Sequence, residues 1–412
     1  MTQGRATTDR PTLVRWRTAM IVAFGLGGVT LSTWGPRLPA ITATLGLDTA
    51  GIGLLLAGVT VGSVAGLLLA TPLLSWLGSR RAIGGVLLLV AVALAVIGLG
   101  VDVVRSVPVV GVGFVIAGLG IGAFDVMINV EGSAIERGLG RTLMPLLHAA
   151  WSAGAAIGSG IGAACAAIGI DPVGQFVGEA VLMAVVAVPV MRAIPLGSRA
   201  TSEEHDPSRT VGQRVQSWLR GWTDWRLLMI GLVMLGAELG EGSANNWLTL
   251  ATKNDHGQSA AVAALFFTAF AIGETTARAL GGPLVDRFGR VRTTRATTAL
   301  GVVGVVLFIL GGSPWLVLVG VLLWAVGVSM GFPLGMSAAA ESGSNPAARV
   351  SVVASIGYFA NLAGPPAIGF LAGATGLLGA LWLVALLLAV AFVAAGSLRP
   401  TRPVADAVPA AG

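Results

Sequence analysis

Two stretches of the chain, TPLLSWLGSRR at residues 71–81 and GPLVDRFGRVR at residues 282–292, decide its fold. They align at a spacing of 211 residues and share four positions, Pro72/Pro283, Leu73/Leu284, Gly78/Gly289 and Arg81/Arg292. A second pair, STW at 32–34 and NNW at 245–247, aligns at a spacing of 213 residues. Repetition at this distance predicts two structural halves related by duplication.

The composition indicates the solvent of these halves. Of the 412 residues, 55% are hydrophobic and 11% are charged, whereas a soluble domain has about 25% charged residues. The 60 glycines suit helices that pack closely inside a bilayer. We therefore predict an integral membrane protein.

Apolar runs divide the chain into membrane spans, because a helix needs about 20 apolar residues to cross the hydrocarbon core. The runs lie near 17–40, 50–75, 82–101, 107–135, 144–169, 173–193, 227–251, 259–285, 296–313, 315–340, 350–373 and 376–397. They predict an all-α fold with twelve transmembrane helices in two pseudo-symmetric six-helix bundles, 17–193 and 227–397.

The basic residues predict the orientation. With the N-terminus inside, 21 of the 25 Lys and Arg residues lie in cytoplasmic segments, as the positive-inside rule requires. These segments include an N-tail (1–16), a linker (194–226) and a C-tail (398–412). Apolar residues at helical spacing beside arginines predict an amphipathic helix in the linker. The formal charge of +6 is thus a topology signal, and no nucleic-acid partner is expected.

Charged residues within the fourth span are candidates for function, because each costs about 2.5–3.5 kcal/mol near the centre of a membrane helix. Asp125 and Asn129 share one face at i,i+4 spacing, and we predict that they face a cavity. Glu131 and His148 either anchor helix ends or join this cluster. Glu136 is expected in the following loop.

The second half contains four more charges within its spans. Glu238 and Glu241 are neighbours on one helix face, and two such carboxylates in a low dielectric do not both ionise. Glu274 and Arg278 have the i,i+4 spacing of an ion pair. The pair is either structural or part of a charge network in which Arg278 neutralises one Glu while the other exchanges a proton. For proton coupling, Asp125 is the first candidate, followed by Glu241 and Glu238.

Aromatic and amide side chains near the expected cavity are candidates for binding a neutral polar ring. They are Trp34, Asn129, Trp151, Asn245, Asn246, Trp247, Tyr358 and Asn361. Each tryptophan could instead be an anchor in the interfacial aromatic belt.

The segment GGPLVDRFGR (281–290) resembles the signature G-x-x-x-D-R-x-G-R of the major facilitator superfamily, which lies between the second and third helices of a half. Helix count, duplication and central loop match this family over the whole chain. The resemblance implies a conformational latch formed by Asp286, Arg287 and Arg290. The first half has Ser75, Trp76 and Ser79 at the matching places, so only one strong latch is expected.

Five further segments resemble the branch of fucose permeases and sugar-permease-like bacterial carriers. They are STWGPRLPAI (32–41), AFDVMINVEG (123–132), LLHAAWSAG (146–154), EGSANNW (241–247) and GYFANLAGPPAIGFLAG (357–373). Two features depart from that branch: residues 17–40 contain no acid, and Asn246 replaces an Asp. Drug/proton antiporters have an Arg where this chain has Phe114.

The resemblance implies a secondary active transporter in a bacterial inner membrane. We expect it to move a small organic solute by alternating access with proton coupling, and the resemblance to sugar-permease-like carriers implies a sugar-like solute. The alternative is drug or metabolite efflux by proton antiport, and a non-transporting receptor is a third possibility. No nucleophile–base cluster, Cys/His metal spacing or phosphate loop is present in the sequence, so we expect no enzyme, metal or cofactor. The expected partners of the monomer are the solute, protons and the lipid bilayer.

Overall fold

The structure, a computed structural model, describes residues 10–47, 49–195, 216, 219–343 and 345–400. Within these ranges the chain forms helices and contains no strand. The first half contains α1 (Arg10–Ser32), η1 (Gly35–Arg37), α2 (Leu38–Leu45), α3 (Thr49–Asp102), α4 (Val107–Leu139), α5 (Met144–Ala167) and α6 (Pro172–Ala193). The second half contains α8 (Trp225–Ser243), the π-helix η3 (Ala244–Leu248), α9 (Thr249–Asn254), α10 (Ala260–Phe288), α11 (Arg290–Leu310), α12 (Pro314–Ser329), α13 (Gly331–Glu341), α14 (Pro346–Thr375), α15 (Leu377–Ala380), α16 (Trp382–Ala394) and η4 (Ala395–Leu398).

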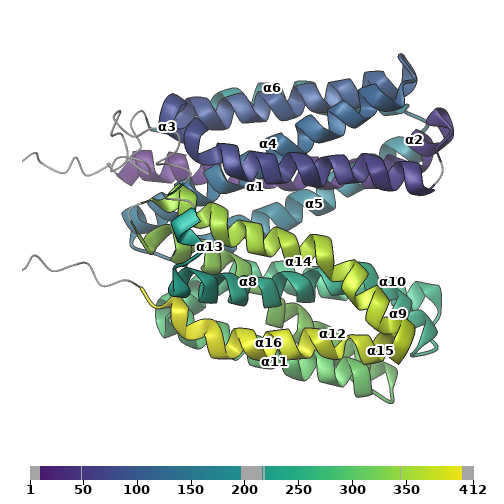
Figure 1. Cartoon of the computed structure of the whole chain (residues 1–412), viewed down its shortest axis with the longest axis vertical. Helices are drawn as coiled ribbons and strands as arrows, with labels where there is room; N and C mark the ends of the chain where they lie inside the picture. Colours follow the sequence, from purple (N-terminus) through teal and green to yellow (C-terminus); the bar gives the residue numbers. More distant parts are fainter. Residues whose placement is uncertain (1–9, 48, 196–215, 217–218, 344, 401–412) are drawn as a thin grey trace, which may run out of the picture.

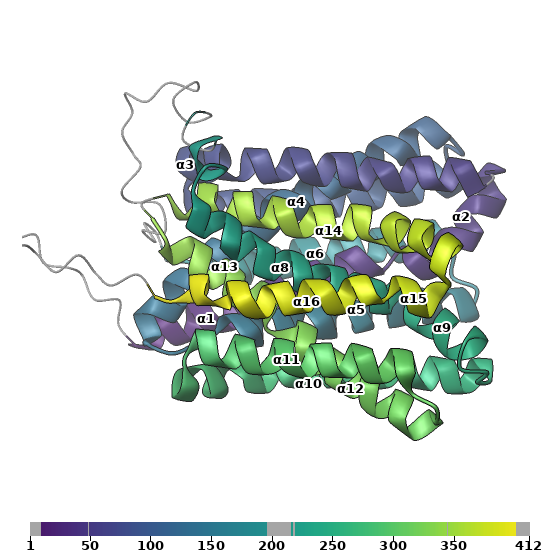
Figure 2. The same ribbon diagram turned by 60° about the horizontal axis from the view of Figure 1, so that its bottom comes forward.

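The helices form two bundles with roughly parallel long axes. Figure 1 shows α1–α6 in the upper bundle and α8–α16 in the lower one. The view in Figure 2 separates α3 and α11 onto opposite edges of the molecule. Helix α1 begins, and η4 ends, at the same end of the molecule, which we call the terminal end; α2, α9 and α15 lie at the opposite end.

The two glycines aligned by the repeat have the same unusual backbone conformation. Gly78 has φ 69° and ψ 159°, and Gly289 has φ 81° and ψ 157°. Positive φ with extended ψ is accessible in practice to glycine alone. Each glycine joins the second and third spans of its half, within α3 and between α10 and α11. The duplication predicted from the sequence is therefore visible in the backbone.

Helices cover every predicted span. Nine helical stretches among the described residues are long and apolar enough to cross a membrane. One of them, Leu54–Asp102, holds two predicted spans on either side of Gly78, and α10 and α14 cover the two spans that remain. Helix α1 begins at Arg10, inside the segment predicted as the N-tail. The predicted amphipathic helix falls mostly on residues 196–215 and 217–218, outside the described ranges.

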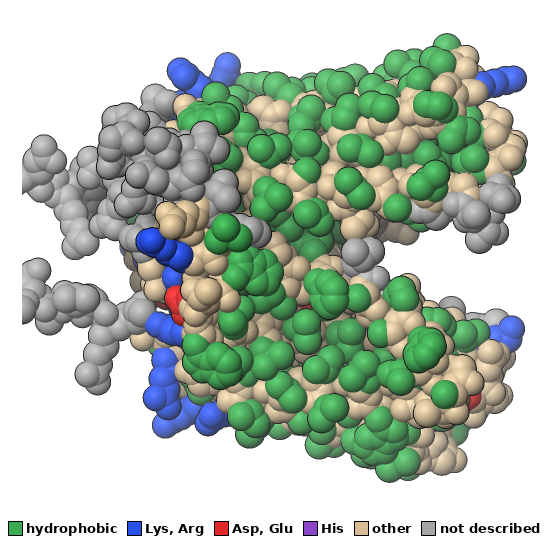
Figure 3. All heavy atoms as spheres, viewed as in Figure 1, with side chains coloured by type: hydrophobic (Ala, Val, Ile, Leu, Met, Phe, Trp, Pro, Cys, Tyr) green, Lys and Arg blue, Asp and Glu red, His purple; other side chains and the backbone are tan. Residues whose placement is uncertain are grey.

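Hydrophobic side chains cover the visible face along its length, while Lys and Arg gather at the ends, mostly at the terminal end (Figure 3). Close helix packing explains some of the glycines. A Cβ atom at Gly154 on α5 would lie 2.0 Å from the carbonyl oxygen of Gly25 on α1. Such contact distances exclude any side chain, as expected where small residues let helices approach in a bilayer.

The two bundles share a hydrophobic core only toward the terminal end. One cluster of buried side chains joins Leu147 of the first bundle to Leu334 and Val353 of the second. A separate cluster, including Phe308 and Trp324, fills the second bundle toward the opposite end. The bundles are thus packed together at one end and separated at the other.

Candidate functional site

A cavity of about 890 Å³ lies between the bundles. Its walls come from α1, α3, α4 and α5 on one side and from α8, α10, α13 and α14 on the other. Figure 3 shows the molecule hollowed between the bundles and widening toward the opposite end. Pockets of about 300–1,000 Å³ accommodate small molecules, so the cavity has the size of a solute site.

Asp125 lines this cavity from α4, in the position predicted from the sequence. Asn129 Nδ2, one turn further along α4, donates to Asp125 Oδ1 at 3.0 Å and to its backbone oxygen at 2.8 Å. His148 Nε2 on α5 lies 3.1 Å from Asn129 Oδ1. Asp125 Oδ2 is buried and has no hydrogen-bond partner among the described residues. The three side chains form a chain of polar contacts that ends at Asp125, a residue of the cavity wall.

His148 on α5 and Glu131 on α4 were predicted either to anchor helix ends or to join this cluster. His148 joins the Asp125 cluster through its contact with Asn129. Its ring is buried between Phe24 and Phe332, with a centroid distance of 5.2 Å to each. Glu131 is also fully buried. It does not anchor the end of its helix, because α4 continues to Leu139. The expectation that Glu136 lies in a loop is wrong for the same reason.

Arg278 is the centre of a charge cluster on the other wall. Its Nη2 atom lies 2.6 Å from Glu241 Oε2 on α8 and 2.8 Å from Glu274 Oε1 one turn earlier on α10. Its Nη1 atom donates to Ser152 Oγ on α5 at 2.7 Å. The geometry predicted for Glu274 and Arg278 is therefore present, while Glu241 and Ser152 are partners from other helices. Arg278 links the two bundles.

Some of the candidate binding residues line the cavity, and others lie elsewhere. Trp151, Asn245 and Tyr358 line the cavity together with Glu238, Glu241 and Arg278. Trp34 packs edge-to-face on Phe114, with ring centroids 5.7 Å apart.

Asn246 and Trp247 are not among the described residues that line the cavity. Asn246 Nδ2 donates to the Gly242 oxygen at 2.6 Å. The buried Trp247 indole N–H has no partner among the described residues, and its ring lies beside Gly369. The side chain of Asn361 lies outside the described residues.

Phe332 and Phe359 line the cavity although the sequence did not single them out. A lone Phe in an apolar helix has no distinguishing pattern. A further buried cluster that we did not predict lies between α1 and α6, where Glu179 Oε1 accepts from Thr33 Oγ1 at 2.6 Å and from Gln175 Nε2 at 3.0 Å. The signal for Glu179 was its charge inside an apolar span. Within the described ranges no group of three His, Cys, Asp or Glu side chains could hold a metal ion.

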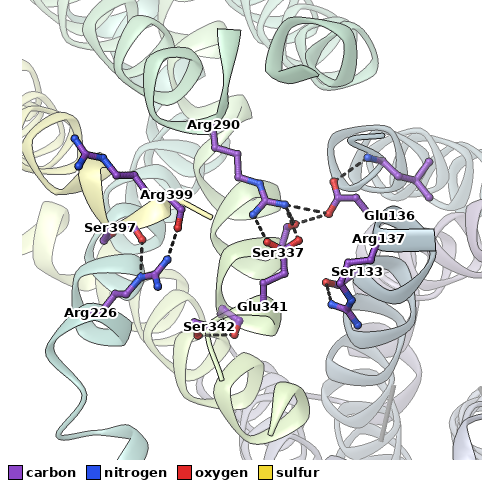
Figure 4. A network of polar contacts seen from close by, with 12 residues as sticks. Ser133, Glu136, Arg137, Arg226, Arg290, Ser337, Glu341, Ser342, Ser397 and Arg399 are labelled. Carbon is purple, nitrogen blue, oxygen red and sulfur yellow. Dashed lines mark hydrogen bonds and ion pairs between the residues drawn. The ribbon is translucent and has the colours of Figure 1, made fainter. Parts of the chain in front are cut away.

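Polar contacts close the terminal end of the cavity (Figure 4). Arg290, at the start of α11, donates to Glu341 at 2.6 and 2.8 Å and to Ser337 at 2.8 Å. Glu136 of the first bundle accepts from the Ser337 hydroxyl and lies 3.6 Å from Arg290. The other carboxylate oxygen of Glu136, Oε1, accepts from the backbone N–H of Leu143 at 2.9 Å. Glu136 therefore joins the first bundle to α11 and α13.

The other two residues of the signature behave differently from Arg290. Asp286 Oδ1 accepts from the backbone N–H of Thr142 at 2.8 Å, which is a second contact between the bundles. Arg287 is exposed and stacks over the Phe288 ring at 5.2 Å. In the first half, Ser75 bonds to the Pro72 oxygen of its own helix.

Comparisons with known proteins agree with this architecture. The model of the Major Facilitator Superfamily matches residues 230–412. An uncharacterised MFS-type transporter of Yersinia pestis is 30% identical over 383 residues, covering 92% of this chain and 94% of the relative. An uncharacterised transporter of Sinorhizobium fredii is 29% identical, covering 95% of this chain and all of the relative.

Solved structures share the fold at low identity. The MFS transporter FucP in its outward conformation, known in Escherichia coli as a fucose:proton symporter, superposes with a TM-score of 0.80 at 16% identity, covering 95% of this chain and 100% of FucP. The human organic anion transporter MFSD10 superposes with a TM-score of 0.74 at 17% identity, covering 93% of this chain and 99% of MFSD10. The duplicated helical bundles and the full-length relative lead to one conclusion: the chain is a membrane-spanning member of the major facilitator superfamily.

Proposed function

We propose that this chain is a proton-coupled secondary transporter that moves a small organic solute by alternating access about the central cavity. The observation that carries the proposal is the cavity itself, which has acidic side chains from both bundles in its wall, opens at one end and is closed by polar contacts at the other. A solute that enters from the open end reaches Asp125 and Glu238 before it meets the closed end.

Alternating access requires the terminal-end contacts to break and the opposite end to close. Glu136, Arg290 and Asp286 hold the bundles together at the terminal end in this state. We assign to Asp286 and Arg290 the latch role implied by the family signature. Arg287, which is exposed, serves the latch only in a different state.

The terminal end faces the cytoplasm in our proposal, because most Lys and Arg residues lie there. The relatives are bacterial, and this supports a bacterial inner membrane as the location. The distribution of Lys and Arg residues supports an orientation with both termini inside. We expect the monomer to be the functional unit, since a single chain contains both walls of the cavity.

Asp125 is the first choice for the proton-coupling residue. It lies in the cavity wall, and its Oδ2 atom has no competing partner among the described residues. Glu238, Glu241 and Glu274 are the other candidates, with Arg278 as counter-charge. Charged groups inside membrane proteins typically mark proton relays and solute pathways.

The test uses purified full-length protein in proteoliposomes that contain a pH-sensitive dye. A panel of neutral sugars, including fucose, and small amines is added under an imposed pH gradient. We expect at least one solute to move together with protons, and Asp125→Asn to abolish that movement. Asp255→Asn, at an exposed loop acid, is the matched control. Solute-dependent proton movement that persists in Asp125→Asn would remove Asp125 from the coupling role.

The alternative, proton antiport for drug or metabolite efflux, predicts proton movement in the opposite direction to the solute. The same dye assay distinguishes the two directions. A solute that binds but never moves would instead favour a receptor.

A further inference from the structure

The charges on the cavity wall are unequal. Asp125, Glu238 and Glu241 line the cavity, whereas Arg278 is the single Lys or Arg among the described lining residues. Asp125 comes from the first bundle and Glu238 and Glu241 from the second, so acids of both bundles face one cavity. Opposite charges attract strongly where water is scarce.

Arg278 is already engaged by the protein. Its two Nη atoms contact Glu241, Glu274 and Ser152 at 2.6–2.8 Å, and its Nε donates to the Ser329 oxygen at 3.3 Å. An anionic solute would have to compete with two carboxylates for this guanidinium. The cavity therefore offers no ready site for a carboxylate or phosphate.

Asp125 provides the complementary feature. Its side chain is 4% exposed, and Oδ2 has no hydrogen-bond donor among the described residues. A buried acceptor without a donor is unfavourable, so a ligand that brings a donor is favoured. An ammonium group brings both a donor and the missing positive charge.

The rest of the lining selects the body of the solute. Five tryptophan, tyrosine and phenylalanine side chains line the cavity, together with aliphatic residues of α3: Trp151, Trp222, Phe332, Tyr358 and Phe359. Aromatic faces attract cations, and the aliphatic wall suits an apolar group. For a polyhydroxylated ring, the described lining offers five neutral hydroxyl or amide side chains, and the remaining hydroxyls of the ring would face the apolar wall: Thr60, Ser63, Asn245, Ser355 and Tyr358.

We propose that the solute is a small organic cation, an amine with an apolar body, whose ammonium group lies between Asp125 and Glu238. This inference rests on the proposed transport function, and it names the class of solute for the same cavity. The sugar-like solute suggested by the sequence resemblance is the competing outcome of the test.

The test uses four probes on purified full-length protein: 2-phenylethylamine, 2-phenylethanol, phenylacetate and fucose. The first three share a ring and a chain length and differ in being cationic, neutral or anionic. Binding is measured by calorimetry and by the change in tryptophan emission. We expect saturable binding of the amine, at least tenfold tighter than that of the alcohol, and weaker binding still of phenylacetate and fucose.

Substitutions locate the ammonium group. Glu238→Gln and Asp125→Asn should each weaken amine binding at least tenfold and weaken binding of the alcohol much less, because the alcohol brings a donor but no charge, while Asp255→Asn should change neither. Size-exclusion profiles establish that each variant is folded, and the selectivity of the unsubstituted protein tests the proposal without any variant. Tighter binding of fucose or phenylacetate, equal binding of amine and alcohol, or no binding of any probe at millimolar concentration would overturn it.

The outcomes for transport are separable. Amine binding without any proton-linked amine flux upholds the solute class and overturns the coupling proposed above. Proton-linked flux of fucose without amine binding upholds the coupling and overturns the solute class.

Discussion

Removing the positive charge at Arg278 should destabilise the protein strongly. Arg278 is 4% exposed and contacts the carboxylates of Glu241 and Glu274 at 2.6 and 2.8 Å. In Arg278→Met the side chain keeps its apolar stem, but the two acids lose their counter-charge. Breaking a buried ion pair by removing one partner costs about 3–5 kcal/mol, and we expect a loss of this size in the free energy of unfolding.

The assay is equilibrium unfolding of the purified protein in detergent micelles, with added SDS as denaturant and tryptophan emission as the signal. Arg287→Met is the matched control, because Arg287 is exposed on the same helix, and its stability should be unchanged. The triple variant with Arg278→Met, Glu241→Gln and Glu274→Gln should recover most of the loss, since no uncompensated charge remains.

Two results would contradict a charge-based role for Arg278. A loss below about 1 kcal/mol in Arg278→Met, the range measured for exposed pairs, would show that water or protons neutralise the cluster at little cost. A triple variant as unstable as the single variant would show that packing, and not charge, holds Arg278 in place.

Three other predictions concern packing, acid stability and closure. Gly154→Ala should destabilise the protein by about 1–3 kcal/mol through overpacking, because the new Cβ would lie 2.0 Å from a backbone oxygen of α1. Gly160→Ala, whose Cβ would have nothing within 4 Å, is the control and should leave the stability unchanged in the same SDS titration. Burial raises the pKa of Asp224, but its hydrogen bond and ion pair with Arg349 outweigh this and hold the pKa below its ordinary value of 3.8. The stabilisation by Asp224 is therefore present at pH 7 and is lost as pH falls below 3.8. Asp224→Asn should lower the thermal stability at pH 7 and reduce the loss of stability in acid. An acid profile equal to that of the unsubstituted protein would contradict this. Glu136→Gln should weaken the terminal-end contacts, and spin labels on α2 and α9 should then report shorter distances as the opposite end closes; unchanged distances would remove Glu136 from the closure.

Much of the fold followed from the sequence because its signals are local. Span length and hydropathy reflect the transfer of each segment into the bilayer, which is independent of the neighbours that the segment later acquires. The match between Gly78 and Gly289 predicted the duplication, and the two residues have nearly the same backbone angles. A positive φ requires glycine at that one position, so it can be recognised from the sequence without knowing the rest of the fold.

Parts of the candidate site were also predictable from helix geometry. Asp125 with Asn129, and Glu274 with Arg278, are pairs at i,i+4 on one helix, and the structure shows both pairs in contact. The helical repeat alone brings such residues together. Glu136 was misplaced because the end of α4 depends on the Gly140 cap, whose positive φ of 61° the apolar pattern does not encode.

Partners on different helices were decided by the tertiary structure. Arg278 contacts Ser152, 126 residues away, and Glu136 contacts Ser337, 201 residues away. Trp34, just after α1, and Trp151, on α5, are both single tryptophans in apolar segments, yet Trp34 packs on Phe114 and Trp151 lines the cavity. The sequence thus determined the spans, their duplication and the contacts within each helix. Which side chains meet across the cavity depends on how each helix is rotated and how closely it packs on its neighbours, and these quantities are set only when both bundles are assembled.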